Sequence, residues 1–247
     1  MSAARSRRGP SSGPCETNNR LRSVLHRRAP ADADWLAAHC ESAMFEAGKV
    51  LSMAGEPHQH VYFPETAVAS VISRMDDGSA VEVGTIGNEG MTGIAVLLGA
   101  TASVYETIVQ IPGAASRVPA AELQKGVDAR PALRHLLNRY ADAYLTQVAQ
   151  TAACNRLHDI ESRCARWLLM THDRVDRAER FPLKQEFLAI MLGVRRAGVS
   201  IAASALQDSG LIQYSRGTIR VVDREGLESA ACECYGTVRR HFDRLLL

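Results

Sequence analysis

The chain has 247 residues, of which 46% are hydrophobic and 23% charged, enough for one large or two modest globular domains. Its formal net charge of +2 neither favours nor excludes a nucleic-acid partner. No apolar run reaches the roughly 18 residues of a membrane-spanning helix, and residues 1–28 lack the apolar core of a signal peptide. The sequence therefore predicts a cytoplasmic protein with no membrane partner.

The charges are segregated along the chain. Residues 1–30 hold seven arginines against one acid, a net charge of +6. Residues 31–154 hold seven basic and fourteen acidic residues (−7), and residues 155–247 hold fifteen basic and twelve acidic residues (+3). The beginning is rich in Ser, Gly, Pro and Arg, which predicts a disordered basic leader over residues 1–20.

The cysteines are spread through the chain, at Cys15, Cys40, Cys154, Cys164, Cys232 and Cys234. Without an export signal they are expected to be reduced thiols. Cys232 and Cys234 form a C-x-C, but we find no second Cys/His pair at zinc-finger spacing. The pattern favours small apolar residues on a helix, so neither a metal site nor a resident cofactor is predicted.

A β-rich segment follows a helix that begins near Asp34. Its runs of β-branched and aromatic residues are separated by turns. The expected strands are Val61–Phe63, Ala67–Ser73, Val81–Ile86, Tyr105–Ile111 and Ala115–Val118. Several short strands at near-regular spacing predict a jelly-roll sandwich or barrel, with a domain over residues 21–130.

A long helix is expected over residues 131–154, with Pro131 in its first turn. Residues at alternating spacings of four and three form an apolar seam. They are Leu133, Leu137, Tyr140, Tyr144, Gln147 and Thr151. Such a seam is typical either of a dimerisation helix or of a helix buried against its own domain, and the spacing alone leaves both open.

A helix over Ile160–Val175 precedes two helices that cross at a tight turn. Gly193 stands at that turn, where a left-handed backbone is unstrained only without a β-carbon. The shared core is expected to comprise Leu188, Leu192, Val194, Val199 and Ala202. This pattern is typical of a helix-turn-helix, whose second helix enters the DNA major groove.

The second helix, Arg195–Gln207, predicts the DNA-reading face. From Phe187 to Gln207 there is no carboxylate. Residues 210–222 then form two short strands around a Ser-Arg-Gly turn, a wing whose tip residue is placed to meet a phosphate. The predicted DNA-contacting residues are Gln185, Arg195, Arg196, Ser200, Ile201, Ser204 and Arg216.

These motifs, in this order, resemble the Crp/Fnr family of bacterial transcription regulators. The resemblance rests on residues 185–207 and on Asp208–Ile212 before the wing. It implies an α+β fold: a β jelly-roll sensor similar to cyclic-nucleotide-binding domains (21–130), a dimerisation helix (131–154), a winged helix-turn-helix (155–226) and a C-terminal helix (227–247). It also implies a homodimer on double-stranded DNA that contacts RNA polymerase, with Arg196 at a base-reading position.

In the sensor, Gly87–Ile94 is similar to the glycine-rich segment that cradles the phosphate in members that bind cyclic nucleotides. Those members carry a ribose-binding Glu where this chain has Met91, and a phosphate-binding Arg that Gly99–Ser103 lacks. We therefore expect no cyclic AMP binding. The resemblance places the effector pocket at Gly90, Met91, Gly93 and Thr101.

Members of the family also bind iron–sulfur clusters or haem, and both can be judged from the ligands that the sequence offers. Cys15 has no neighbouring cysteine with which to hold an iron–sulfur cluster. His58 and His60 leave haem ligation open, although two loop histidines are more often only loop residues.

The sequence therefore predicts a DNA-binding transcription regulator that binds a near-palindromic site as a homodimer. An alternative is a protein-interaction module with a ligand-free barrel, in which DNA binding is secondary. An enzyme is not expected, because no nucleophile elbow, Walker loop, zinc-protease motif or paired-carboxylate constellation is present.

Overall fold

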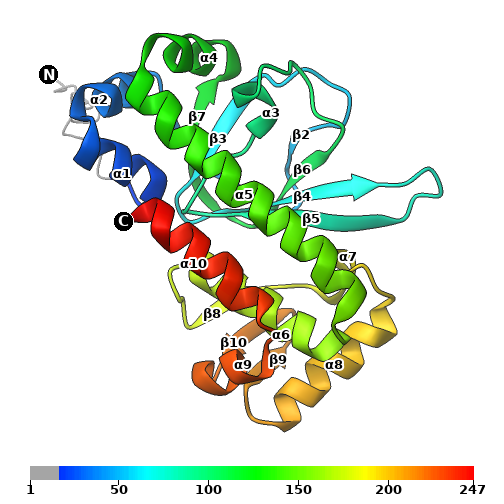
Figure 1. Cartoon of the computed structure of the whole chain (residues 1–247). Helices are drawn as coiled ribbons and strands as arrows, with labels where there is room; N and C mark the ends of the chain where they lie inside the picture. Colours follow the sequence, from blue (N-terminus) through cyan, green and yellow to red (C-terminus); the bar gives the residue numbers. More distant parts are fainter. Residues whose placement is uncertain (1–16) are drawn as a thin grey trace, which may run out of the picture.

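The computed structural model describes residues 17–247 (Figure 1). Helices α1 (Arg20–Arg28) and α2 (Pro30–Ala38) precede the β-rich domain. Its strands are β1 (Glu41–Phe45), β2 (Val50–Ser52), β3 (His60–Pro64), β4 (Val68–Arg74), β5 (Ala80–Ile86), β6 (Glu106–Ile111) and β7 (Gly113–Pro119). They form two antiparallel sheets, ordered β1-β7-β3 and β2-β6-β4-β5. The predicted α+β class and the double-sheet architecture of this domain are confirmed, and β1 and β2 are additional to the predicted strands.

Strand β4 is covered on both faces, which explains its nearly continuous burial. Val68 and Ile72 lie in the core. Ser70 stands between them in the strand, and its hydroxyl lies 3.3 Å from the Met191 sulfur of the C-terminal domain, while Ala69 and Val71 on the opposite face are also buried. The barrel is thus packed directly against the elements that follow it in the chain.

Three helices follow within and after the barrel: α3 (Ile94–Leu97), α4 (Ala120–Ala129) and α5 (Pro131–Leu157). Helix α5 runs from α4 past the barrel to the C-terminal domain (Figure 1). Pro131 occupies its first turn, where the missing N–H removes no intrahelical hydrogen bond.

The predicted seam of α5 packs inside the chain. Leu133 and Leu137 belong to the core. The Tyr140 hydroxyl donates to the Met91 carbonyl (2.8 Å), and Tyr144 packs against Gly84 of β5. Leu133, Leu137, Tyr140 and Tyr144 therefore form no exposed dimer seam, and their assignment is corrected: the helix is buried against its own domain.

The C-terminal domain comprises α6 (Ile160–Arg174), β8 (Arg180–Pro182), α7 (Gln185–Leu192), α8 (Arg196–Asp208), β9 (Ile212–Ser215), β10 (Thr218–Val221), α9 (Arg224–Ala230) and α10 (Cys234–Leu246). The single helix expected over 227–247 is thus two helices. Helix α10 returns antiparallel along α5, with His241 beside Asp142 and Cys234 beside Gln150 (Figure 1). Within residues 17–247 no single helix is long and apolar enough to cross a membrane; the bent pair α7 and α8 passes that test of length and composition only when taken together.

The end of the predicted leader is ordered. Residues 1–16 lie outside the described residues, but Asn19 is fully buried and its side chain caps α1. The same side chain donates to the carbonyls of Pro64 and Gly90. Arg22 on α1 donates to Ser116 of β7. The prediction of disorder is therefore wrong for Asn19 and Arg20, because long-range contacts outweigh the local polar composition.

Candidate nucleic-acid interface

Helices α7 and α8 form the predicted helix-turn-helix. Gly193 ends α7 with φ of +61°, and the two helix axes are bent by 100°. The amide of Gly193 donates to Ile190 and that of Val194 to Ala189, which satisfies the carbonyls at the helix end. Of the predicted shared core, Leu188, Leu192, Val199 and Ala202 are buried and Val194 is half-buried.

The polar face of α8 points away from this core. Arg195, Arg196 and Ser204 are exposed, Ile201 is 69% exposed, and Ser200 is half-buried. Arg195, Arg196 and Ser200 lie toward the beginning of the helix, the part that contacts base edges in helix-turn-helix proteins. The first turn of α8 contains no acidic residue.

Arg196 has two partners on α7. Its Nε donates to Gln185 Oε1 (3.3 Å), and its guanidinium lies 3.6 Å from Glu186 Oε1. Arg196 and Glu186 are each about two-thirds exposed, so their ion pair contributes little and can exchange for another anion. Glu186 was missed as a partner because the acid-free stretch begins one residue later, at Phe187.

The wing is the hairpin of β9 and β10. Arg216 and Gly217 link the strands, and both have positive φ (+50° and +74°), as a two-residue type I′ turn requires. Arg216 is exposed at the tip. A hollow of about 290 Å³ lies between the hairpin tip and the start of helices α7 and α8. It is lined by Arg216 of the tip, Gln185 of α7 and Arg196 of α8. Strand β8, which sequence reasoning missed, completes the sheet in the order β8-β10-β9.

Comparison with known proteins supports this geometry. Residues 162–230 match the Crp-like helix-turn-helix domain family. Residues 162–230 therefore form a Crp-like helix-turn-helix domain. No curated protein matches the chain by sequence.

Several solved structures share the fold. A CRP-family transcriptional regulator of Thermus thermophilus is 20% identical with a TM-score of 0.64, over 76% of this chain and 96% of that one. A Crp/Fnr-family regulator of Eubacterium rectale is 13% identical, with a TM-score of 0.65 over 84% and 96%. The c-di-GMP-responsive regulator CLP of Xanthomonas campestris is 15% identical, with a TM-score of 0.63 over 78% and 98%.

The predicted effector residues are not arranged around one open space. A β-carbon at Gly90 would overlap the ring of Tyr140 from α5. Met91 is fully buried, and Gly93 begins α3 with φ of +75°. Thr101 is exposed on the following loop, where its carbonyl accepts from the His58 amide. The side of the segment next to α5 is therefore filled by Tyr140.

The glycine-rich segment instead supplies a buried charge. Glu89 pairs with Arg174 of α6 at 2.9 Å, and each side chain is only 6% exposed. Arg174 also donates to Gln147 of α5 (2.6 Å) and to the Met170 carbonyl (2.8 Å). One guanidinium thus ties the sensor, α5 and α6 together. Beside it lies a cavity of about 400 Å³ that Arg20 and Arg239 also line.

A second buried carboxylate lies at the same boundary. Glu82 of β5 accepts from the Trp167 indole (2.9 Å) and from the Thr85 hydroxyl (2.8 Å). Its other oxygen has no hydrogen-bond partner among residues 17–247. Burial raises the pKa of Glu82, although these hydrogen bonds oppose the shift.

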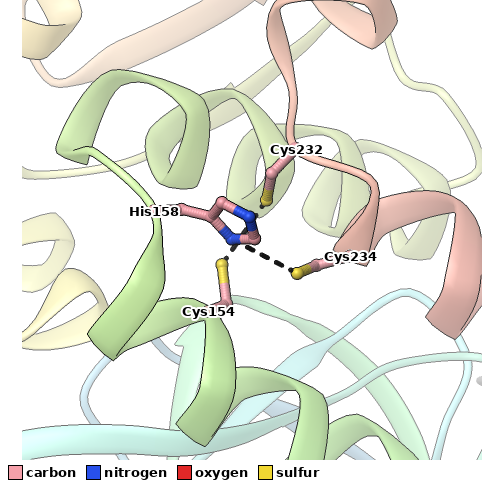
Figure 2. A group of neighbouring side chains, drawn as sticks. All are labelled: Cys154, His158, Cys232 and Cys234. Carbon is pink, nitrogen blue, oxygen red and sulfur yellow. Dashed lines mark hydrogen bonds between the residues drawn. The ribbon is translucent and has the colours of Figure 1, made fainter.

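The structure also joins the Cys232–Cys234 pair to Cys154 and to a histidine that the sequence analysis did not consider. Cys154, His158, Cys232 and Cys234 meet where α5 ends and α10 begins (Figure 2). The missed signal is the C-x3-H of Cys154 and His158, which faces the C-x-C across the fold. The Cys154 and Cys232 sulfurs are 3.4 Å apart, and their hydrogen bond lowers the pKa of Cys232 to about 6.

Proposed function

We propose that the chain is a Crp/Fnr-type regulator, which binds a near-palindromic DNA site as a homodimer and so controls transcription. Two-fold symmetry would place the two copies of α8 in successive major grooves, with half-sites roughly 10 bp apart. As part of this role, we propose that the protein contacts RNA polymerase and is located in the cytoplasm.

The observation that carries the proposal is the convergence of Gln185, Arg196 and Arg216 on one hollow between the reading helix and the wing. Arg196 can offer guanine a bidentate pair. Arg216 is suited to a phosphate, which fixes the register of the protein on DNA. Arg195, Ser200, Ile201 and Ser204 extend the same face along α8.

The substitution Arg196→Ala tests base reading. Fluorescence anisotropy would measure affinity at fixed salt for a site selected from random DNA and for unselected DNA. We expect a loss of about 1–3 kcal/mol, roughly 5- to 150-fold, on the selected site and a much smaller loss on unselected DNA. Arg28→Ala, an equal charge change at an exposed position at the end of α1, is the control. Equal weakening on both DNAs would make Arg196 a phosphate contact only.

The proposed dimer uses the face of α5 that the barrel leaves open. Leu145, Ala149 and Ala152, beyond the Asp142 that pairs with His241 of α10, are exposed at spacings of four and three, and Leu145 is 65% exposed. Small and apolar residues at this spacing suit a second copy of the same helix.

Leu145→Asp should therefore give a monomer at concentrations where the wild type is dimeric, as measured by sedimentation. Met44→Asp, which changes a 75% exposed residue on β1, should stay dimeric. A wild-type monomer, or a dimeric Leu145→Asp, would contradict this interface.

We further propose that the sensor does not hold a cyclic nucleotide at Gly87–Ile94, because Tyr140 fills the space beside Gly90. The arginine next to this segment, Arg174, is already paired with Glu89, so a buried phosphate would have to displace that carboxylate to gain a charge-assisted partner. Thermal shift with cyclic AMP and cyclic di-GMP should then show no stabilisation, whereas a true effector raises the melting temperature by mass action. A saturable shift with cyclic AMP that is abolished by Gly90→Ala would overturn this part.

A further inference from the structure

The strongest unassigned feature of the chain is the cluster of three thiols and one imidazole at the foot of α5. Cys154 lies in the last turn of α5, His158 ends that helix, and Cys232 and Cys234 flank the start of α10. One ligand atom from each residue lies within 4.8 Å of every other (Figure 2). Cys154 and Cys234 are fully buried and Cys232 is nearly so.

We propose that these four residues bind one Zn²⁺ ion. A tetrahedral zinc with Zn–S bonds of about 2.3 Å separates its ligand atoms by roughly 3.8 Å. Cys154 Sγ and Cys232 Sγ are 3.4 Å apart, and Cys234 Sγ lies 3.5 Å from His158 Nδ1. An iron–sulfur cluster places several atoms between its thiolates and needs a wider spacing. The spacing therefore fits a single ion.

Residues around the cluster hold its ligands in orientation. His158 points Nδ1 at Cys234 and its other nitrogen, Nε2, at Glu233 Oε1, 3.3 Å away. Such a carboxylate fixes the tautomer of a metal-binding histidine. The Gln150 amide donates to Cys234 Sγ (3.1 Å).

The local charge also suits the ion. Three thiolates and Zn²⁺ carry a net charge of −1, which is costly to bury without a cation nearby. Arg166 on α6 is buried, and it contacts α5 at Thr151, one turn before Cys154. Its Nε has no hydrogen-bond partner among the described residues.

The ion would join segments that are 78 residues apart in sequence. It would fasten the start of α10 to the end of α5 and so fix the C-terminal domain on the long helix. The role is structural, because four protein ligands leave no open position for a substrate. This inference does not depend on DNA binding.

Metal analysis of the purified, untagged full chain tests the proposal. The wild type should contain about one zinc per chain, and Cys232→Ser and His158→Ala should contain little. His158→Cys, which supplies a thiolate in place of the imidazole as fourth ligand, should retain zinc. Cys40→Ser, a cysteine outside the cluster, should match the wild type.

A second measurement does not depend on the variants folding. Chelation should lower the melting temperature of the wild type, and zinc should restore it. Cobalt added to the chelated protein should give the absorption of a tetrahedral thiolate site. Chelated wild type that takes up neither metal would overturn the proposal. Iron with acid-labile sulfide would equally overturn it, and so would a Cys154–Cys232 disulfide that persists after the protein has been treated with reductant.

Discussion

Arg174→Met should be among the most destabilising single changes at the boundary between sensor and reading domain. The guanidinium is 6% exposed and makes hydrogen bonds to Glu89, Gln147 and the Met170 carbonyl. Methionine preserves most of the apolar stem but leaves Glu89 as a buried charge without its partner. Removing one member of such a pair costs about 3–5 kcal/mol, a fall in melting temperature of roughly 6–20 °C for a chain of this size.

Denaturant unfolding of three variants tests this reasoning. The double variant Glu89→Gln/Arg174→Met removes both charges and should recover much of the stability lost in Arg174→Met. Arg74→Met breaks the pair with Glu106, which is shorter (2.8 Å) but half-exposed at the arginine, and should cost about 1 kcal/mol or less. If Arg174→Met costs no more than Arg74→Met, or the double variant is no better than the single, the buried pair does not hold the two domains together.

Two further predictions concern the same boundary. Glu82→Gln should stabilise the protein at pH 8, because the raised pKa of Glu82 means that stability is lost as pH rises above the ordinary glutamate range; the gain in unfolding free energy should shrink toward pH 4, and a gain independent of pH would refute the assignment. Gly193→Ala should cost about 1–2 kcal/mol for its positive φ, plus a contact 3.0 Å from Val81 of β5. Gly210→Ala, also at positive φ but with open space, isolates the conformational part, and equal losses of unfolding free energy would discount the Val81 contact.

The helix-turn-helix and the wing were predicted closely from short stretches of sequence. Helix α8 begins at Arg196 and ends at Asp208, against a predicted Arg195–Gln207. Gly193 marks the turn because the need for a left-handed backbone conformation falls on that one residue. The Ser-Arg-Gly wing is equally local. Features of this kind are legible in sequence because their cause lies within a few residues.

Features with distant causes were not predictable in the same way. The spacing along α5 indicates that Tyr140 and Leu137 are buried, but not that Met91 of their own chain rather than a partner helix covers them. Helix α1 is held by Asn19 and Arg22 reaching strands 45 and 94 residues away. The ligand pair of Cys154 and His158 gains meaning only once the fold brings α10 beside it.

Helix α6 contacts both the barrel and the helices of the proposed DNA-binding face, so it can couple the two within a single chain. Trp167 binds Glu82 of the barrel, and Arg174 binds Glu89 beside the glycine-rich segment. On the same helix Arg163 donates to the Leu192 carbonyl at the end of α7, and α8 packs along α6. An effector that bound one state of the Glu89 segment better would therefore shift α6, and with it the orientation of Arg196. We expect Arg174→Met to alter DNA affinity as well as stability, whereas Arg74→Met, on the outer end of β4, should leave DNA affinity unchanged and cost little stability.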